Sequence, residues 1–177
     1  MGTGQRDIYF AAGCFWGAEK FFRLLDGVVE TEVGFANGNT PDPTYKEVYT
    51  DETGYAETVR VRYDASQIGL EALVRLFFKI IDPLSLNRQG EDEGTRYRTG
   101  VYYSDQADEA AISAVFAEVE KAIGQPVVVE KLPLRNFYPA EEYHQRYLDK
   151  NPGGYCHLSP AFFEMARNYK SRQTNPR

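Results

Sequence analysis

Two cysteines and one glutamate are the residues whose types and settings in this chain point to chemistry. Cys14 lies in Ala12-Gly13-Cys14-Phe15-Trp16-Gly17-Ala18, between a predicted short strand (Asp7 to Ala12) and a stretch of helical spacing that Gly27 ends. Unpaired N–H groups at a helix N-terminus favour an anion, so we expect a lowered pKa for the Cys14 thiol and a nucleophilic thiolate. The alternative is a small cysteine buried in the core.

Glu57 begins a segment that alternates in the manner of a half-buried strand. Val59, Val61 and Tyr63 share its predicted face, which is the apolar one. A carboxyl group on that face is desolvated, which raises its pKa and allows it to donate a proton near neutral pH. The same pattern also fits a glutamate at the end of a strand that turns into solvent.

Cys156 follows a stretch rich in glycine and proline, Asn151-Pro152-Gly153-Gly154, which has no strand pattern. There is no C-x-x-C pair, and in a reducing compartment a bond between the two cysteines would be transient. The alternative is an inert cysteine in the C-terminal segment. Zinc would need Cys14, Cys156, His144 and His157, whose spacing fits no common ligand pattern, so we expect no metal.

Composition narrows the class of protein. The chain has 177 residues, 42% of them hydrophobic, and a formal net charge of -6. This length suits one domain, and the negative charge argues against a nucleic-acid or anionic-membrane surface. No apolar run reaches the roughly 18 residues of a membrane span, and the first twelve residues lack a secretory signal pattern. We therefore expect a cytoplasmic protein that acts on a protein or a small molecule. We also expect it to be a monomer.

The rest of the pattern predicts an α+β fold. Strands are expected at 28–36, 57–63, 99–103 and 126–132, helices at 70–81, 105–123 and 139–150, and polar loops at 37–44 and 83–98. This order indicates a small mixed β-sheet with packed helices, similar to the split β-α-β units of a ferredoxin-like core. We expect a single catalytic domain over 1–177, with a long irregular C-terminal arm at about 134–177 that carries Cys156 and frays at 171–177.

Five blocks of the sequence resemble the A-type peptide methionine sulfoxide reductases. They are Gly13-Cys14-Phe15-Trp16-Gly17; Pro43-Thr44-Tyr45; Thr53-Gly54 with Ala56-Glu57; Gln89-Gly90 with Asp92, Gly94, Tyr97 and Arg98; and Asn151-Pro152 with Gly154-Tyr155-Cys156. The match keeps a consistent order and spacing from about Ile8 to Cys156. The chain departs from the family pattern at Phe35 and at Tyr55, and we expect these departures to change the hydrogen bonding around Glu57.

The resemblance implies a reaction without a cofactor. Cys14 attacks the sulfur of the S epimer of methionine sulfoxide, free or in proteins, and Glu57 protonates the oxygen. Methionine then leaves a sulfenic acid on Cys14, which condenses with Cys156 to a disulfide. Thioredoxin reduces this disulfide, and the biological role is the repair of oxidised proteins.

The resemblance also implies a substrate site. Tyr45 and Tyr97 are similar to the hydroxyl donors that polarise the sulfoxide oxygen, and Asp92 to the polar anchor beside them. Phe15 and Trp16 are similar to the walls of the pocket for the S-methyl group, although aromatic rings in general are core material.

Two other classes of function remain open from the residues alone. A cysteine hydrolase would use His144 as the base that activates Cys14, but the neighbours of His144 predict a surface helix residue. A non-catalytic redox sensor would oxidise Cys14 without turning over a sulfoxide.

Overall fold

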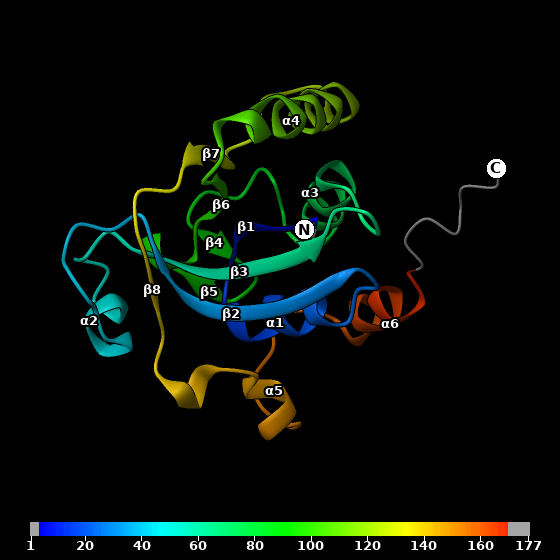
Figure 1. The fold of residues 1–177 in the computed structure, drawn as a ribbon. Helices are drawn as coiled ribbons and strands as arrows, with labels where there is room; N and C mark the ends of the chain where they lie inside the picture. Colours follow the sequence, from blue (N-terminus) through cyan, green and yellow to red (C-terminus); the bar gives the residue numbers. More distant parts are fainter. Residues whose placement is uncertain (1–3, 170–177) are drawn as a thin grey trace.

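The computed structural model describes residues 4–169 as a curled sheet with helices packed on it (Figure 1). The strands are β1 (Gln5–Ala12), β2 (Val28–Ala36), β3 (Ala56–Asp64), β4 (Arg88–Gln89), β5 (Asp92–Glu93), β6 (Thr99–Tyr103), β7 (Glu130–Pro133) and β8 (Phe137–Pro139). The helices are α1 (Phe15–Arg23), α2 (Tyr45–Tyr49), α3 (Leu70–Lys79), α4 (Glu109–Ile123), α5 (Tyr147–Lys150) and α6 (Pro160–Asn168). The α+β prediction is confirmed. The predicted frayed end, 171–177, lies outside the described residues.

The main sheet has six strands in the order β7-β6-β1-β3-β2-β8. β3 pairs antiparallel with both β1 and β2, so it lies between the two strands that α1 connects. β6 pairs antiparallel with β1 on its other side, and β7 is parallel to β6. β4 and β5 form a separate small hairpin. The middle of the sheet therefore brings the end of β1 next to the start of β3.

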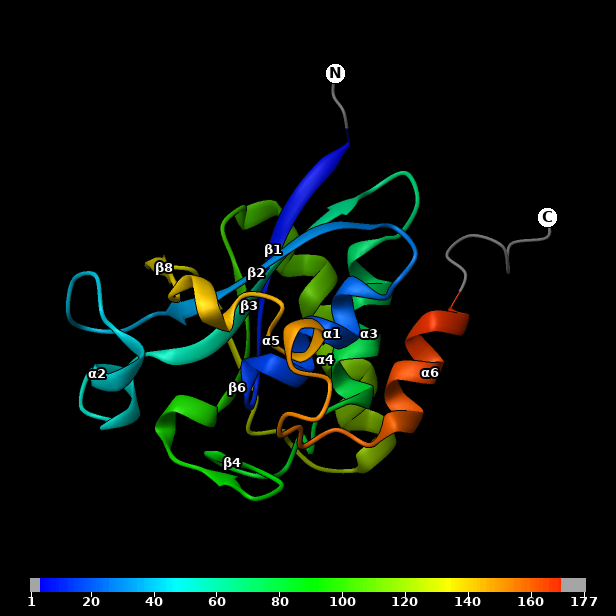
Figure 2. The same ribbon diagram turned by 90° about the horizontal axis from the view of Figure 1, so that it is seen from below.

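The two faces of the sheet are covered differently. One face packs under α1, α3 and α4 (Figure 2). The core on this face joins Phe10 on β1 to Phe22 on α1 and to Phe77 on α3 by stacked rings. The opposite face carries a smaller hydrophobic cluster around Tyr9 and Tyr102, and Phe137 packs against it. α6 contacts α1 from outside the main helix layer. None of the helices in the described part of the chain is both long and apolar enough to cross a membrane.

The structure differs from the predicted elements in places where the signal was short. α2 lies between the loop predicted at 37–44 and a polar turn predicted at 50–54, where the sequence predicted no helix, and Thr44 and Glu47 form a capping box at its start. The alternation of 28–36 predicts Val29 on the same side as Val33 and Phe35, but Val29 is exposed, because the β2 register shifts between Val28 and Glu30. α6 was not predicted.

The predicted helix at 139–150 is divided in two. A 3₁₀ turn, Glu142–His144, is followed by α5, and the second of the two residues between them, Arg146, has a φ of 53°. A left-handed residue ends a run of helical geometry, so the two short pieces point differently.

Candidate active site

Cys14 lies at the N-cap position of α1, as the strand-to-helix pattern predicts. Gly13, with a φ of 81°, makes the turn between β1 and α1, which glycine adopts without a Cβ clash. The Cys14 side chain makes no capping hydrogen bond, and the residue is only 6% exposed. The thiol therefore lies in a tight turn that is largely buried from solvent.

Glu57 faces the same turn from β3. It is 1% exposed, and its Oε1 accepts the backbone N–H of Phe15 at 3.1 Å. Its Oε2 is buried without a hydrogen-bond partner among residues 4–169. Burial raises the pKa of this carboxyl to about 8, although the Phe15 N–H acts in the opposite direction. Glu57 is therefore a buried acid that keeps its proton at neutral pH, next in space to the residue after Cys14.

The pKa of Cys14 was predicted to be lowered, and this prediction is wrong. Burial raises it well above the usual thiol value, ionisation of the neighbouring Glu57 raises it further, and the backbone N–H of Trp16 lowers it by less. Desolvation disfavours the thiolate more strongly than the helix N-terminus favours it. The protein without substrate therefore holds a neutral thiol beside a carboxylic acid.

Two tyrosine hydroxyls lie near this pair. Tyr45 begins α2, and Tyr97 ends the 3₁₀ turn Thr95–Tyr97. Burial raises the pKa of both hydroxyls, and ionisation of Glu57 raises both further. Tyr45 and Tyr97 therefore remain protonated donors close to Glu57.

Phe15 and Trp16 have different surroundings. Phe15 is buried, with its ring 5.6 Å from that of Phe35 and 6.4 Å from that of Tyr45. Trp16 is half-buried and stacks on Tyr147 at a centroid distance of 3.8 Å. Phe35, one of the two departures from the family pattern, thus packs behind the site. The other, Tyr55, is buried and donates its hydroxyl to the backbone oxygen of Thr40.

His144 was predicted on the surface, and this is wrong, because it is 1% exposed. Its Nδ1 accepts the indole N–H of Trp16 at 3.0 Å, and its ring lies 4.4 Å from that of Tyr45. A neutral imidazole that accepts at Nδ1 carries its proton on Nε2. His144 therefore orients Trp16.

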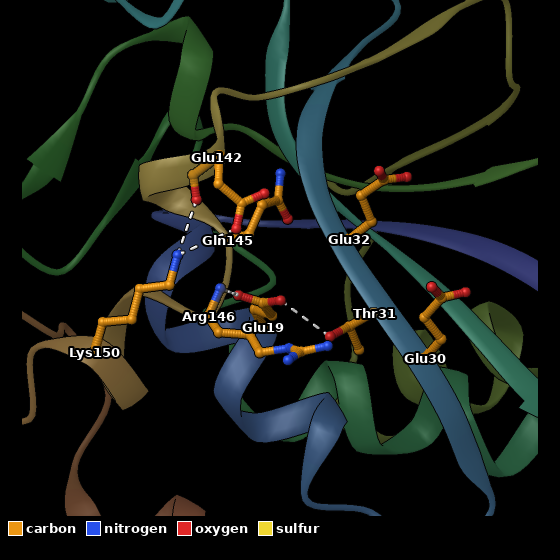
Figure 3. Close-up of a pocket in the computed structure, with 8 residues that line it drawn as sticks. All are labelled: Glu19, Glu30, Thr31, Glu32, Glu142, Gln145, Arg146 and Lys150. Atoms are coloured by element: carbon orange, nitrogen blue, oxygen red, sulfur yellow. Dashed lines mark hydrogen bonds and ion pairs between the residues drawn. The ribbon is translucent and has the colours of Figure 1, made fainter.

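A buried carboxylate holds the His144 segment in place (Figure 3). Glu19 on α1 accepts the backbone N–H of Arg146 at 2.7 Å and the Thr31 hydroxyl at 3.0 Å. These contacts join α1 and β2 to the turn between His144 and Tyr147. Sequence reasoning assigned no role to Glu19, although its helical spacing from Phe15 and Phe22 places it on the buried face of α1.

Cys156 lies against the first turn of α1. A Cβ added at Gly17 would lie 2.7 Å from the Cys156 sulfur. The thiol is half-buried, and both cysteines are free. Asp92, on β5, accepts the hydroxyl of Tyr155 at 3.1 Å. The structure thus brings all eight residues of the predicted site to the region where α1 begins.

Comparison with known proteins gives the family. The family model described as peptide methionine sulfoxide reductase matches residues 6–175. The chain belongs to this family. It is 53% identical over 164 residues to the peptide methionine sulfoxide reductase MsrA of Lachnoclostridium phytofermentans, covering 93% of this chain and 99% of that protein. The predicted resemblance to the A-type members is therefore confirmed.

The fold is similar to solved structures of Mxr1 from Saccharomyces cerevisiae. The reduced form has a TM-score of 0.84 and 38% identity, covering 90% of this chain and 93% of the other. Mxr1 in complex with Trx2 has a TM-score of 0.59 and 26% identity, covering 83% and 87% of the two chains.

Proposed function

We propose that this reductase uses Cys14 and Glu57 to reduce the S epimer of methionine sulfoxide, free or in proteins, to methionine. As a member of its family the protein is a thiol oxidoreductase whose role is the repair of oxidised proteins. The observation that carries the residue roles is the buried, protonated Glu57, whose Oε1 contacts the N–H of the residue after Cys14. A sulfoxide oxygen is a poor leaving group until it is protonated, so the nucleophile needs such an acid beside it.

Cys14 and Glu57 together supply the electrons and the proton that the reduction needs. The Cys14 sulfur attacks the sulfoxide sulfur while Glu57 gives its proton to the oxygen. The hydroxyl group passes to Cys14 as methionine leaves, so the sulfoxide is reduced by two electrons and Cys14 becomes a sulfenic acid. The original thiol proton of Cys14 returns to Glu57. The raised pKa of the thiol is compatible with this cycle, because the thiol loses its proton only as the carboxylate forms.

The substrate is held by groups that surround the pair. Tyr45 and Tyr97 donate their hydroxyls to the sulfoxide oxygen, and Asp92 anchors the polar part of the substrate. Phe15 and Trp16 enclose the S-methyl group. A fixed apolar wall opposite fixed donors accepts one epimer and rejects the other, because the second places its methyl where the donors are.

Cys156 resolves the sulfenic acid, and thioredoxin reduces the resulting disulfide. The Cys156 thiol attacks the Cys14 sulfur, forming the S–S bond and releasing water. The half-buried Cys156 lines an open cavity with Lys20, Leu148 and Phe163, which gives a protein dithiol access that the buried Cys14 lacks. The complex of Mxr1 with Trx2 supports thioredoxin as the partner.

The site is complete in one chain, which supports a monomeric enzyme with a single catalytic domain over 1–177. We place it in the cytoplasm, where thioredoxin is kept reduced. No metal or organic cofactor is needed, because the two thiols carry both electrons.

The test uses the separated S and R epimers of N-acetyl-methionine sulfoxide with dithiothreitol. We expect only the S epimer to disappear and Cys14→Ser to abolish the reaction. Cys156→Ser is expected to remain active with dithiothreitol and to lose turnover with thioredoxin. Equal use of both epimers, or activity that survives Cys14→Ser, contradicts the proposal.

Two alternatives give different outcomes. A hydrolase needs His144 as a base, yet its Nδ1 is occupied by Trp16. A redox sensor predicts oxidation of Cys14 by peroxide with no methionine formed from either epimer.

A further inference from the structure

A buried imidazole beside the second cysteine has no part in the reaction described so far. His157 follows Cys156 directly, and only 5% of its side chain is exposed. Neither ring nitrogen makes a hydrogen bond of full geometry within residues 4–169, although the backbone oxygen of Ala12 faces the ring. A buried polar atom without a partner costs about 1–3 kcal/mol. An imidazole kept in this position therefore calls for a physical reason.

The ring lies between the Cys14 turn and the β4–β5 hairpin. A Cβ added at Gly13 would lie 3.2 Å from Nε2 of His157, so the ring packs on the residue before Cys14. On the other side, Nδ1 lies 3.9 Å from Oδ2 of Asp92. That separation is too long for a hydrogen bond, but a movement of about 1 Å closes it. The imidazole is therefore placed to bind Asp92 without being fully bound in this state.

The same oxygen of Asp92 also accepts the hydroxyl of Tyr155. One carboxylate thus faces both neighbours of Cys156 in the chain. Between them, the Cys156 sulfur points at Gly17 in the first turn of α1. Fixing residues 155 and 157 on Asp92 fixes the sulfur next to the helix that begins just after Cys14.

We propose that His157 is a positioning residue for disulfide formation. With Tyr155 it docks the Cys156 segment on Asp92, and so sets the rate at which the Cys156 thiol reacts with the sulfenic acid of Cys14. In that step the Cys156 thiol loses its proton, the S–S bond forms and the S–O bond of the sulfenic acid breaks. The oxygen leaves as water, and no other reductant is involved. The inference rests on the roles proposed above for the two cysteines.

Asp92 has a second use, which orders the two steps. It is also the proposed anchor for the substrate, so the substrate and the Cys156 segment compete for one carboxylate. Docking is completed after methionine leaves. His157 is therefore expected to affect disulfide formation and not the formation of methionine.

A single-turnover experiment separates the two steps. Pre-reduced full-length protein, freed of reductant, is mixed with excess N-acetyl-methionine (S)-sulfoxide and quenched at intervals. Methionine, free thiols and dimedone-trapped sulfenic acid on Cys14 are then measured. In His157→Phe, which keeps a ring but no polar nitrogen, we expect methionine to form within about twofold of the wild-type rate. We expect thiol loss to slow by about tenfold, as for the loss of one hydrogen bond to a charged group, and the dimedone adduct to accumulate.

Three further variants keep the test decisive. His157→Asn places an amide donor near the Nδ1 position and is expected to restore most of the rate of thiol loss. Tyr155→Phe removes the other contact with Asp92 and is expected to slow thiol loss with normal methionine formation. Ser159→Ala removes the N-cap of α6 in the same segment without touching Asp92, and it is expected to change neither rate.

The opposing outcomes are equally clear. Wild-type thiol loss in His157→Phe overturns the inference, and so does an equal slowing of both steps that His157→Asn does not rescue. Absence of methionine formation in the wild-type protein would instead overturn the proposed function on which the inference rests.

Discussion

Replacing Glu57 by glutamine makes the stability of the protein depend on pH in a different way. In the folded protein its pKa is about 8, raised by burial from an ordinary value of 4.5. Because the pKa of Glu57 is higher in the folded protein than in the unfolded chain, its protonated carboxyl group favours the folded state. This contribution to the free energy of unfolding is fully present below pH 4.5 and is lost as the pH rises towards 8. One pKa unit corresponds to about 1.4 kcal/mol, so the loss approaches about 5 kcal/mol above pH 8, with about 3 kcal/mol lost by pH 7.

Glutamine does not titrate, and its carbonyl oxygen can still accept the N–H of Phe15. Its amide NH₂ takes the place of the unpartnered Oε2 and costs about 1–3 kcal/mol at every pH. Because this cost is the same at every pH, it does not affect how the difference between the two proteins changes with pH. The difference in free energy of unfolding, Glu57→Gln minus wild type, should therefore increase by about 4 kcal/mol between pH 5 and pH 9.

Urea unfolding at a series of pH values measures this difference. Both proteins carry Cys14→Ser, so that the thiol does not titrate or oxidise. Glu52→Gln, an exposed glutamate in the same Cys14→Ser background, controls for the amide. Parallel stability curves for Glu57→Gln and its reference would refute the reasoning, because they would mean that Glu57 is not a desolvated acid.

Three further changes test the arrangement around this acid. Gly17→Ala puts a Cβ 2.7 Å from the Cys156 sulfur, so we expect slower loss of thiols after one turnover with methionine formation unchanged, measured by rapid quench. Trp16→Phe removes the donor to His144 and should lower the free energy of unfolding by about 1–3 kcal/mol and weaken the preference for the S epimer, measured by urea unfolding and by KM for each epimer. Glu19→Ala removes the acceptor of two hydrogen bonds and should cost about 2–4 kcal/mol by urea unfolding, while Glu164→Ala, an exposed glutamate, should cost little.

Strand and helix periodicity predicted most of the fold. The strands at 28–36 and 99–103 were predicted with their observed bounds, because a strand with a buried face repeats every two residues. α2 was missed because it has five residues, too few for a helical repeat, and depends on the contact between Thr44 and Glu47. α6 was missed although Ser159 caps it and Pro160 begins it.

The features of the candidate site also divide into those that local sequence predicted and those that it did not. The position of Cys14 at the start of a helix and the inward face of Glu57 follow from short stretches of sequence. The pKa of Cys14 and the burial of His144 were predicted wrongly, because each depends on residues far away in the chain. Burial among distant segments, and then the carboxyl group of Glu57 on β3, raise the pKa of Cys14, while the indole of Trp16 pairs with the buried ring of His144.

The amino-acid sequence by itself determined which residues can carry the reaction and on which side of its own strand or helix each one lies, because periodicity and chain geometry act locally. Only the tertiary structure decided the distances between residues of separate elements. Those distances set the protonation states of Glu57 and Cys14 and the position of Cys156 against Gly17. Desolvation and close packing are properties of what surrounds a group in space, and those surroundings exist only once distant segments have come together.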